Sequence, residues 1–144
     1  MSGGSERFFL DTNVLIYSFD ERSKSKQKRA ADLVETALTT HRGVINYQVV
    51  QEFLSAASRK FADALSPDEL RVYLERVLMP LCEVFPDSRL YSQAISISSD
   101  MRISFYDALI VSSALIADCR ILWTEDLQDG RKIGGLQIRN PFLK

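Results

Sequence analysis

The chain has 144 residues, of which 46% are hydrophobic and 26% are charged. This length suits one domain that buries enough apolar surface to fold without disulfides or a structural metal. The composition excludes an intrinsically disordered chain. The net charge of −1 gives no overall attraction for nucleic acid, so binding of that kind would need local positive charge or bound metal.

Neither a membrane span nor a signal peptide is predicted. No apolar run approaches the ~20 residues that a span needs, and the start of the chain lacks a basic region followed by an apolar one. We therefore expect a cytoplasmic protein with a flexible leader at residues 1–6 and one domain at 7–144. Cys82 and Cys119 lie in apolar sequence without metal-ligand spacing, so buried free thiols are expected.

The first half of the chain predicts two strands and three helical segments. Residues 8–10 form a short apolar strand that ends at Asp11, and a helical turn or two follows. Apolar residues at helical spacing predict a helix at 24–40, which Gly43 ends, and 44–45 is the second strand. Asn46 is typical of the N-cap of a further helix at 47–61.

The second half continues the same alternation. Ser66, followed by Pro67 and by Glu69, predicts a helix start, and Pro80 is expected to end that helix. Residues 82–85 and 120–123 are predicted strands, 136–138 a last edge strand, and 87–100 and a segment from Ser104 are predicted helices. The expected fold is α/β, with a short, mostly parallel central sheet of about five strands flanked by helices on both faces.

Four acids mark the ends of predicted strands or the helices that follow them. Asp11 ends the first strand, Glu52 lies in the second turn of a helix, Asp107 lies in the first turn of another, and Asp126 follows the fourth strand. Ligands of parallel sheets bind outside the carboxyl ends of the strands, so these side chains can reach one crevice. Crowded carboxylates need a balancing cation, and oxygen ligands select Mg²⁺ or Mn²⁺. One or two such ions could activate a water against a phosphodiester.

Each acid also has a purely structural interpretation. Asp11 and Asp107 could cap helices, Asp126 could lie in a turn, and Glu52 could be a solvated helix residue. Other chemistries find less support. The only histidine, His41, lies at the end of a polar helix, where a solvated or capping role is expected, and no phosphate-binding glycine motif is present.

Four segments resemble the motifs of the PIN-domain family over about residues 7–140. They are LDTNVLIY at 10–17, VVQEF at 49–53, SFYDALI at 104–110 and LWTED at 122–126. The resemblance is greatest to VapC-type toxins of bacterial toxin–antitoxin pairs. It implies a PIN-like nuclease domain that hydrolyses RNA with Mg²⁺ or Mn²⁺, forms a homodimer and is blocked by a cognate antitoxin.

The resemblance also implies roles for individual residues. Metal-binding and catalytic roles fall to Asp11, Glu52, Asp107 and Asp126, and hydrogen-bonding support falls to Thr12, Asn13 and Thr124. The family often has an aromatic residue shortly after the fourth acid, whereas Leu127 follows Asp126 here. Glu125 or Asp129 could therefore share or replace the role of Asp126.

A basic run after the first motif could hold RNA phosphates, although a solvated helix face is the simpler interpretation. The run consists of Arg22, Lys24, Lys26, Lys28 and Arg29. Arg59–Lys60 and Arg131–Lys132 are expected to be surface charges. Tyr106, next to Asp107, could stack on an unpaired base, although packing at the rim is the expected role.

Two other functions compete with the ribonuclease. In a phosphatase or phosphotransfer domain, Asp11 would be the nucleophile, but Asn13 stands where a second aspartate would support it, and no lysine occupies the later strand end. The other is a catalytically silent PIN fold that only binds an antitoxin or RNA. Four intact acids disfavour that function, because a silent copy has no need of them.

Overall fold

A six-stranded sheet forms the centre of the computed structural model, which describes residues 6–143. Most of the expected leader therefore lies outside the described residues. The strands stand in the order β3 (Cys82–Val84), β2 (Gly43–Asn46), β1 (Phe8–Leu10), β4 (Ile121–Trp123), β6 (Leu136–Arg139) and β5 (Lys132–Ile133). All neighbours are parallel except β5 and β6. The predicted mostly parallel α/β fold is confirmed, with one strand more than expected.

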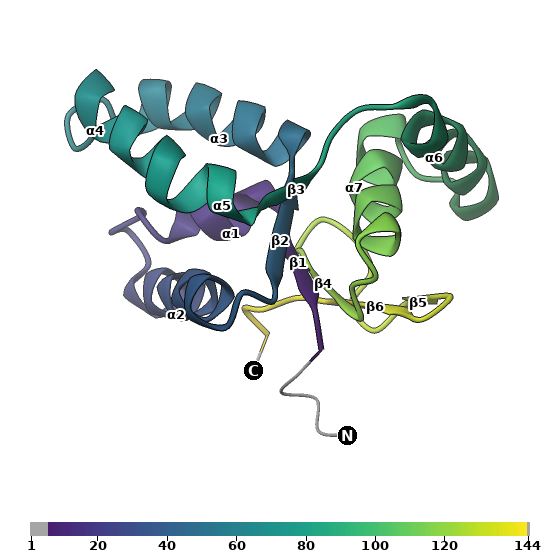
Figure 1. Cartoon of the computed structure of the whole chain (residues 1–144). Helices are drawn as coiled ribbons and strands as arrows, with labels where there is room; N and C mark the ends of the chain where they lie inside the picture. Colours follow the sequence, from purple (N-terminus) through teal and green to yellow (C-terminus); the bar gives the residue numbers. More distant parts are fainter. Residues whose placement is uncertain (1–5, 144) are drawn as a thin grey trace.

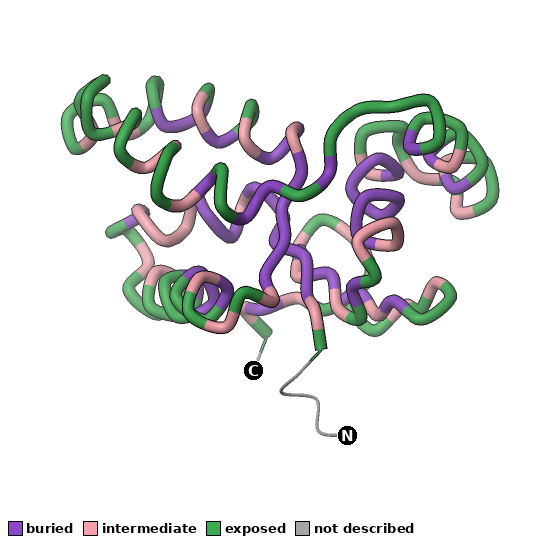
Figure 2. Tube along the Cα trace, in the orientation of Figure 1, coloured by how far each residue is buried: buried purple, intermediate pink, exposed green. Residues whose placement is uncertain are grey.

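Helices cover both faces of the sheet (Figure 1). On one side lie α1 (Thr12–Tyr17), α2 (Lys24–Thr40), α3 (Tyr47–Lys60), α4 (Pro67–Tyr73) and α5 (Met79–Leu81). On the other side lie α6 (Ser88–Met101) and α7 (Phe105–Ile116). Every residue of β1 and β2 is buried, and the helices turn their buried faces toward these strands (Figure 2). Both faces of the central strands must be apolar because both are covered, which is why these strands do not alternate.

Two predictions about local structure were wrong. Pro80 does not end its helix, which continues one residue further, to Leu81. The helix passes through a π-helical turn, η2 (Leu74–Leu78), in which the N–H of Met79 donates to the carbonyl of Leu74, and Leu78 and Met79 both keep right-handed helical dihedrals. The strand at 136–139 is not an edge strand either, because β5 folds back on it through a turn in which Gly134 has φ +58°.

The thiol and histidine predictions agree with the structure. Cys82 and Cys119 are free and buried. Burial raises the pKa of both thiols, that of Cys119 to about 12, so neither thiol forms a reactive thiolate at neutral pH. His41 is exposed and caps the C-terminus of α2 in the left-handed conformation. Within residues 6–143, no helix is both long and apolar enough to cross a membrane.

Asn46 connects β2, α3 and α7 in the centre of the protein. Its Oδ1 accepts a hydrogen bond from the N–H of Val49 at 2.9 Å, which is the predicted N-cap of α3. Its Nδ2 donates to the hydroxyl of Ser113 at 2.8 Å, and the Asn46 side chain is completely buried. This one amide therefore sets where α3 begins and holds it against α7.

Asn46→Ala is expected to lower the free energy of unfolding by about 2–4 kcal/mol. It removes a helix cap, and it leaves a buried N–H and a buried hydroxyl with fewer partners. Urea denaturation measures the loss. Ser66→Ala is the matched control, because Ser66 caps the exposed helix α4 and its loss should cost only about 1 kcal/mol. Equal losses in the two variants would contradict the central role of Asn46.

Candidate active site

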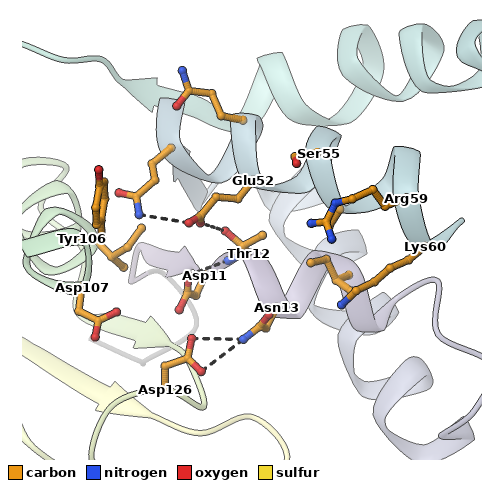
Figure 3. Close-up of a pocket in the computed structure, with 15 residues that line it drawn as sticks. Asp11, Thr12, Asn13, Glu52, Ser55, Arg59, Lys60, Tyr106, Asp107 and Asp126 are labelled. Carbon is orange, nitrogen blue, oxygen red and sulfur yellow. Dashed lines mark hydrogen bonds between the residues drawn. The ribbon is translucent and has the colours of Figure 1, made fainter. Parts of the chain in front are cut away.

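A cavity of about 480 Å³ opens at the carboxyl ends of β1, β2 and β4. Three helices, α1, α3 and α7, contribute to its walls. All four acids singled out in the sequence line this cavity (Figure 3). The charged and polar lining residues include Asp11, Thr12, Asn13, Gln48, Glu52, Ser55, Arg59, Lys60, Tyr106, Asp107 and Asp126.

Asp11 is the most buried of the four acids, with 8% of its surface exposed. One oxygen accepts a hydrogen bond from the N–H of Thr12 at 2.7 Å, which makes Asp11 the N-cap of α1. The other accepts from the hydroxyl of Thr124 at 2.7 Å. Burial raises the pKa of Asp11 from 3.8 to about 7 despite these hydrogen bonds, and the charges of Asp126 and Glu52 add to the shift. The capping interpretation of Asp11 is therefore confirmed, and the hydrogen bond to Thr124 is an additional contact.

Asp126 is held from two sides. The amide of Asn13 donates to both of its oxygens, at 3.4 and 3.2 Å, and its own N–H donates to the hydroxyl oxygen of Thr124 at 3.1 Å. The Thr124 hydroxyl thus joins the loops that carry Asp11 and Asp126. Burial raises the pKa of Asp126, and the nearby charges of Asp107 and Glu125 raise it further.

Glu52 enters the cavity from the second turn of α3. Its Oε1 accepts a hydrogen bond from the hydroxyl of Thr12 at 2.6 Å, and its Oε2 accepts from Nε2 of Gln48 at 3.5 Å (Figure 3). Asp107 comes from the first turn of α7, where its N–H donates to the capping hydroxyl of Ser104 at 3.1 Å. No side-chain hydrogen bond of the described chain engages the Asp107 carboxylate, so it faces the cavity unconstrained.

The two acids considered as substitutes for Asp126 point elsewhere. Glu125 forms an ion pair with Lys26 at 3.6 Å. Asp129 accepts a hydrogen bond from the N–H of Asn140 at 2.7 Å, which closes the loop between β4 and the end of β6. Neither lines the cavity, whereas Asp126 does.

The basic run from Arg22 to Arg29 lies away from this cavity, and most of its side chains contact other parts of the protein. None of its five members lines the cavity. Arg22 pairs with Asp20 at 2.8 Å, Lys26 pairs with Glu125, and Lys28 reaches Asp32 at 3.4 Å. Arg29 donates to the carbonyl of Pro141 and lies over the ring of Trp123, and Lys24 is exposed.

The cations that do line the cavity, Arg59 and Lys60, were expected to be ordinary surface residues. A signal for them exists in the sequence. They follow Glu52 by about two helical turns and therefore share its face of α3. Tyr106 also lines the cavity; it lies at the rim as expected, where its ring packs edge-on against that of Phe105 and 67% of its surface stays exposed.

The carboxylate oxygens that line the cavity are donors of the kind that a hard divalent cation takes. Within residues 6–143, no three Asp, Glu, His or Cys side chains converge on one point in the present arrangement. Mg²⁺, however, usually binds through one or two carboxylates, with water and substrate phosphate as its other ligands. The raised pKa values of Asp11 and Asp126 are a further sign of fit, because a cation between these carboxylates would relieve their repulsion. Oε1 of Gln48 is also a buried acceptor without a partner beside Glu52.

Comparisons with known proteins place this arrangement in a class. The chain matches the model of the PIN-domain family over residues 8–132. The chain therefore belongs to the PIN-domain family. A comparison with curated protein sequences found no match.

Solved structures with a similar fold come from toxin–antitoxin complexes. The chain resembles one from Klebsiella pneumoniae with a TM-score of 0.67 and 18% identity, covering 93% of this chain and 97% of that one. The likeness to DNA-bound VapBC from Salmonella typhimurium has a TM-score of 0.65 and 18% identity, and it covers 94% of this chain and 98% of that one. The likeness to VapBC-1 from nontypeable Haemophilus influenzae has a TM-score of 0.61 and 20% identity, and it covers 93% of this chain and 97% of that one. At this level of identity the likeness shows a common fold.

Proposed function

We propose that this protein is a metal-dependent endoribonuclease and the toxin of a toxin–antitoxin pair. The observation that carries the proposal is the cavity that Asp11, Glu52, Asp107 and Asp126 enter from four separate segments of the chain. Membership of the PIN-domain family and the likeness to toxin–antitoxin structures support it. The same likeness supports a cognate antitoxin as a partner, and a homodimer is proposed beside it.

The proposed cofactor is Mg²⁺ or Mn²⁺, with one or two ions per site. Asp11 and Asp126 would hold it, with Glu52 and Asp107 completing the set directly or through water. When bound, such an ion lowers the pKa of a water and offsets the charge that develops on a phosphodiester.

The chain's own residues keep the carboxylates in place for this chemistry. The hydroxyls of Thr12 and Thr124 and the amide of Asn13 each donate a hydrogen bond to one acid, which leaves further lone pairs free for a cation. The low exposure of Asp11 limits access of bulk water and strengthens electrostatic interactions in the cavity. Thr12, Asn13 and Thr124 are therefore proposed as positioning residues.

A phosphatase with Asp11 as the attacking group fits less well. Both oxygens of Asp11 are held by hydrogen bonds, and Asn13 stands where a second aspartate would assist the transfer. A silent binding module gives no reason for the carboxylate of Asp107, which lines the cavity and receives no side-chain hydrogen bond from residues 6–143.

Asp107→Asn is expected to remove RNA cleavage while leaving the fold intact. The purified protein, freed of any bound partner, would be incubated with single-stranded and structured RNAs in Mg²⁺, in Mn²⁺ or in EDTA. We expect cleavage by the wild type with either metal and none in EDTA or in the variant. Asp118→Asn is a matched control, since Asp118 lies outside this cavity. Cleavage in EDTA, or equal cleavage by Asp107→Asn, would refute the proposed function.

A further inference from the structure

Helix α3 carries one polar face along the whole cavity. Gln48, Glu52, Ser55 and Arg59 all line the cavity, and they are spaced four, three and four residues apart, which places them on one side of a helix. The rise of ~1.5 Å per residue puts Arg59 about 10 Å from Glu52 along the helix axis. Figure 3 shows Tyr106 and Asp107 at one end of the cavity and Arg59 and Lys60 at the other, with Glu52 between them.

The basic end of this face is available to a ligand. No ion pair found within residues 6–143 includes Arg59 or Lys60, and both line the cavity. Both side chains are exposed, and they stand at the far end of the cavity from Asp107. Cations placed beside a phosphodiester-cleaving site and left free by the protein match a further phosphate of the same strand.

The opposite end offers an aromatic surface. Tyr106 is 67% exposed, and its ring lies edge-on to that of Phe105 with centroids 6.1 Å apart. Unpaired bases stack on exposed aromatic rings of this kind, whereas bases inside a duplex cannot reach them.

We infer that α3 guides one unpaired RNA strand across the cavity. The phosphate to be cleaved lies at the carboxylates, a neighbouring base stacks on Tyr106, and later phosphates bind Arg59 and Lys60. The inference rests on the proposed ribonuclease function and names its substrate form. Phosphates of one strand are ~3.4 Å apart along a stacked helix and farther apart when extended, so the basic end receives a phosphate one to three nucleotides from the cleaved one.

The first test removes the two cations and measures RNA binding. Arg59→Met/Lys60→Met is compared with Arg131→Met/Lys132→Met, which removes the same two charges outside the cavity. Affinity for a labelled single-stranded oligoribonucleotide is measured over a range of salt, in the Asp107→Asn background so that the RNA stays intact. We expect the slope of log affinity against log salt to fall by about 1.4 in the first variant, ~0.7 per lost phosphate contact, and to stay unchanged in the second.

Cleavage kinetics provide a second readout. In the active background, the Arg59/Lys60 variant should raise KM while kcat stays within about twofold, because these contacts hold the strand in the ground state and the transition state alike. A neutral methylphosphonate placed one to three nucleotides from the cleaved bond should reproduce the loss. At one of these positions, combining the methylphosphonate with the Arg59/Lys60 variant should raise KM no further than either change alone.

Tyr106 is tested by a conservative pair of variants. Tyr106→Ala should weaken binding of single-stranded RNA about tenfold, and Tyr106→Phe should retain it, because stacking needs the ring and not the hydroxyl. Duplex RNA should bind all three proteins equally weakly. Equal affinity of the alanine variant and the wild type would overturn the stacking contact.

The outcomes separate this inference from the proposed function. If the wild type cleaves RNA but the Arg59/Lys60 variant keeps the salt slope and KM of its control, the strand path is wrong and the nuclease stands. If the only effect of that variant is a lower melting temperature, the two cations serve the C-terminus of α3, and the inference is overturned. If no RNA is cleaved, the proposed ribonuclease function is wrong. The salt dependence of RNA affinity then still shows whether Arg59 and Lys60 bind the strand.

Discussion

Asp11→Asn is expected to lower metal-dependent RNA cleavage by about 10³-fold or more. A bound cation supplies several kcal/mol of charge stabilisation, and each ~1.4 kcal/mol corresponds to a factor of ten in rate. Asparagine keeps the size of the side chain and can still accept the hydrogen bond from the N–H of Thr12, whereas its amide nitrogen cannot accept the one from the Thr124 hydroxyl. An unchanged melting temperature beside the lost cleavage would show that the effect comes from the missing charge and not from a changed fold.

The same substitution is expected to stabilise the metal-free protein at alkaline pH. Burial is the main cause that raises the pKa of Asp11 from 3.8 to about 7, so the folded protein retains a proton that the unfolded chain has already lost. The free energy of unfolding of the wild type therefore falls as pH rises from about 4 to about 7 and stays low above it. The uncharged variant does not undergo this loss.

Urea denaturation in EDTA at about pH 5 and about pH 8 measures the difference. Between about pH 5 and about pH 8, we expect the free energy of unfolding of Asp11→Asn to rise relative to that of the wild type. Asp32→Asn, an exposed control on α2, should behave as the wild type does. Added Mg²⁺ should then stabilise the wild type and not the Asp11 variant, because only a folded site that binds the ion gains from it. A variant that is less stable than the wild type at both pH values would contradict the expected cost of burying this charge.

Gly43→Ala is expected to lower the free energy of unfolding by about 2–3 kcal/mol. A Cβ at Gly43 would lie 2.1 Å from the Cβ of Ala37 and 2.7 Å from its Cα, so β2 and α2 would have to move apart. Overpacking of this kind costs about 1–3 kcal/mol, and the upper part of that range applies because one of the opposing atoms belongs to the backbone. Urea denaturation of the purified variant measures the loss.

Two further variants show whether the close approach is the cause. Gly135→Ala should change the free energy of unfolding by less than about 0.5 kcal/mol, because the new Cβ would meet only Arg120, at an ordinary 3.7 Å. Ala37→Gly alone should lower the free energy of unfolding by the ~1 kcal/mol that glycine costs in a helix. In the Ala37→Gly background, Gly43→Ala should lower the free energy of unfolding by less than it does in the wild type, because the opposing Cβ is gone. Strict additivity of the two substitutions would show that the strain at Gly43 lies elsewhere.

Local signals in the sequence account for most of the secondary structure. Apolar periodicity and capping residues such as Asn46, Ser66 and Ser104 act over three or four neighbours, so they can be read without knowing the fold. Local rules failed where a neighbouring turn compensates. The π-helical turn before Pro80 is one such case, and the short hairpin that places β5 outside β6 is another.

The candidate site was predictable only in part. The four acids follow strands or open helices, and because the strands are parallel, their carboxyl ends meet at one edge of the sheet. Which cations join them was not predictable in the same way. The run from Arg22 to Arg29 looked more basic than Arg59–Lys60, but its partners come from distant segments such as Glu125 and Pro141.

The sequence by itself determined most of the element order, the mostly parallel sheet, and the strand ends and helix starts that carry Asp11, Glu52, Asp107 and Asp126. These follow from periodicity and from the geometry of parallel strands. Only the tertiary structure decided how the acids are held and which cations remain free. The hydrogen bonds from Thr124 to Asp11 and from Asn13 to Asp126 each span 113 residues. Contacts at such separations depend on how strands pair and helices pack, and no local pattern specifies them.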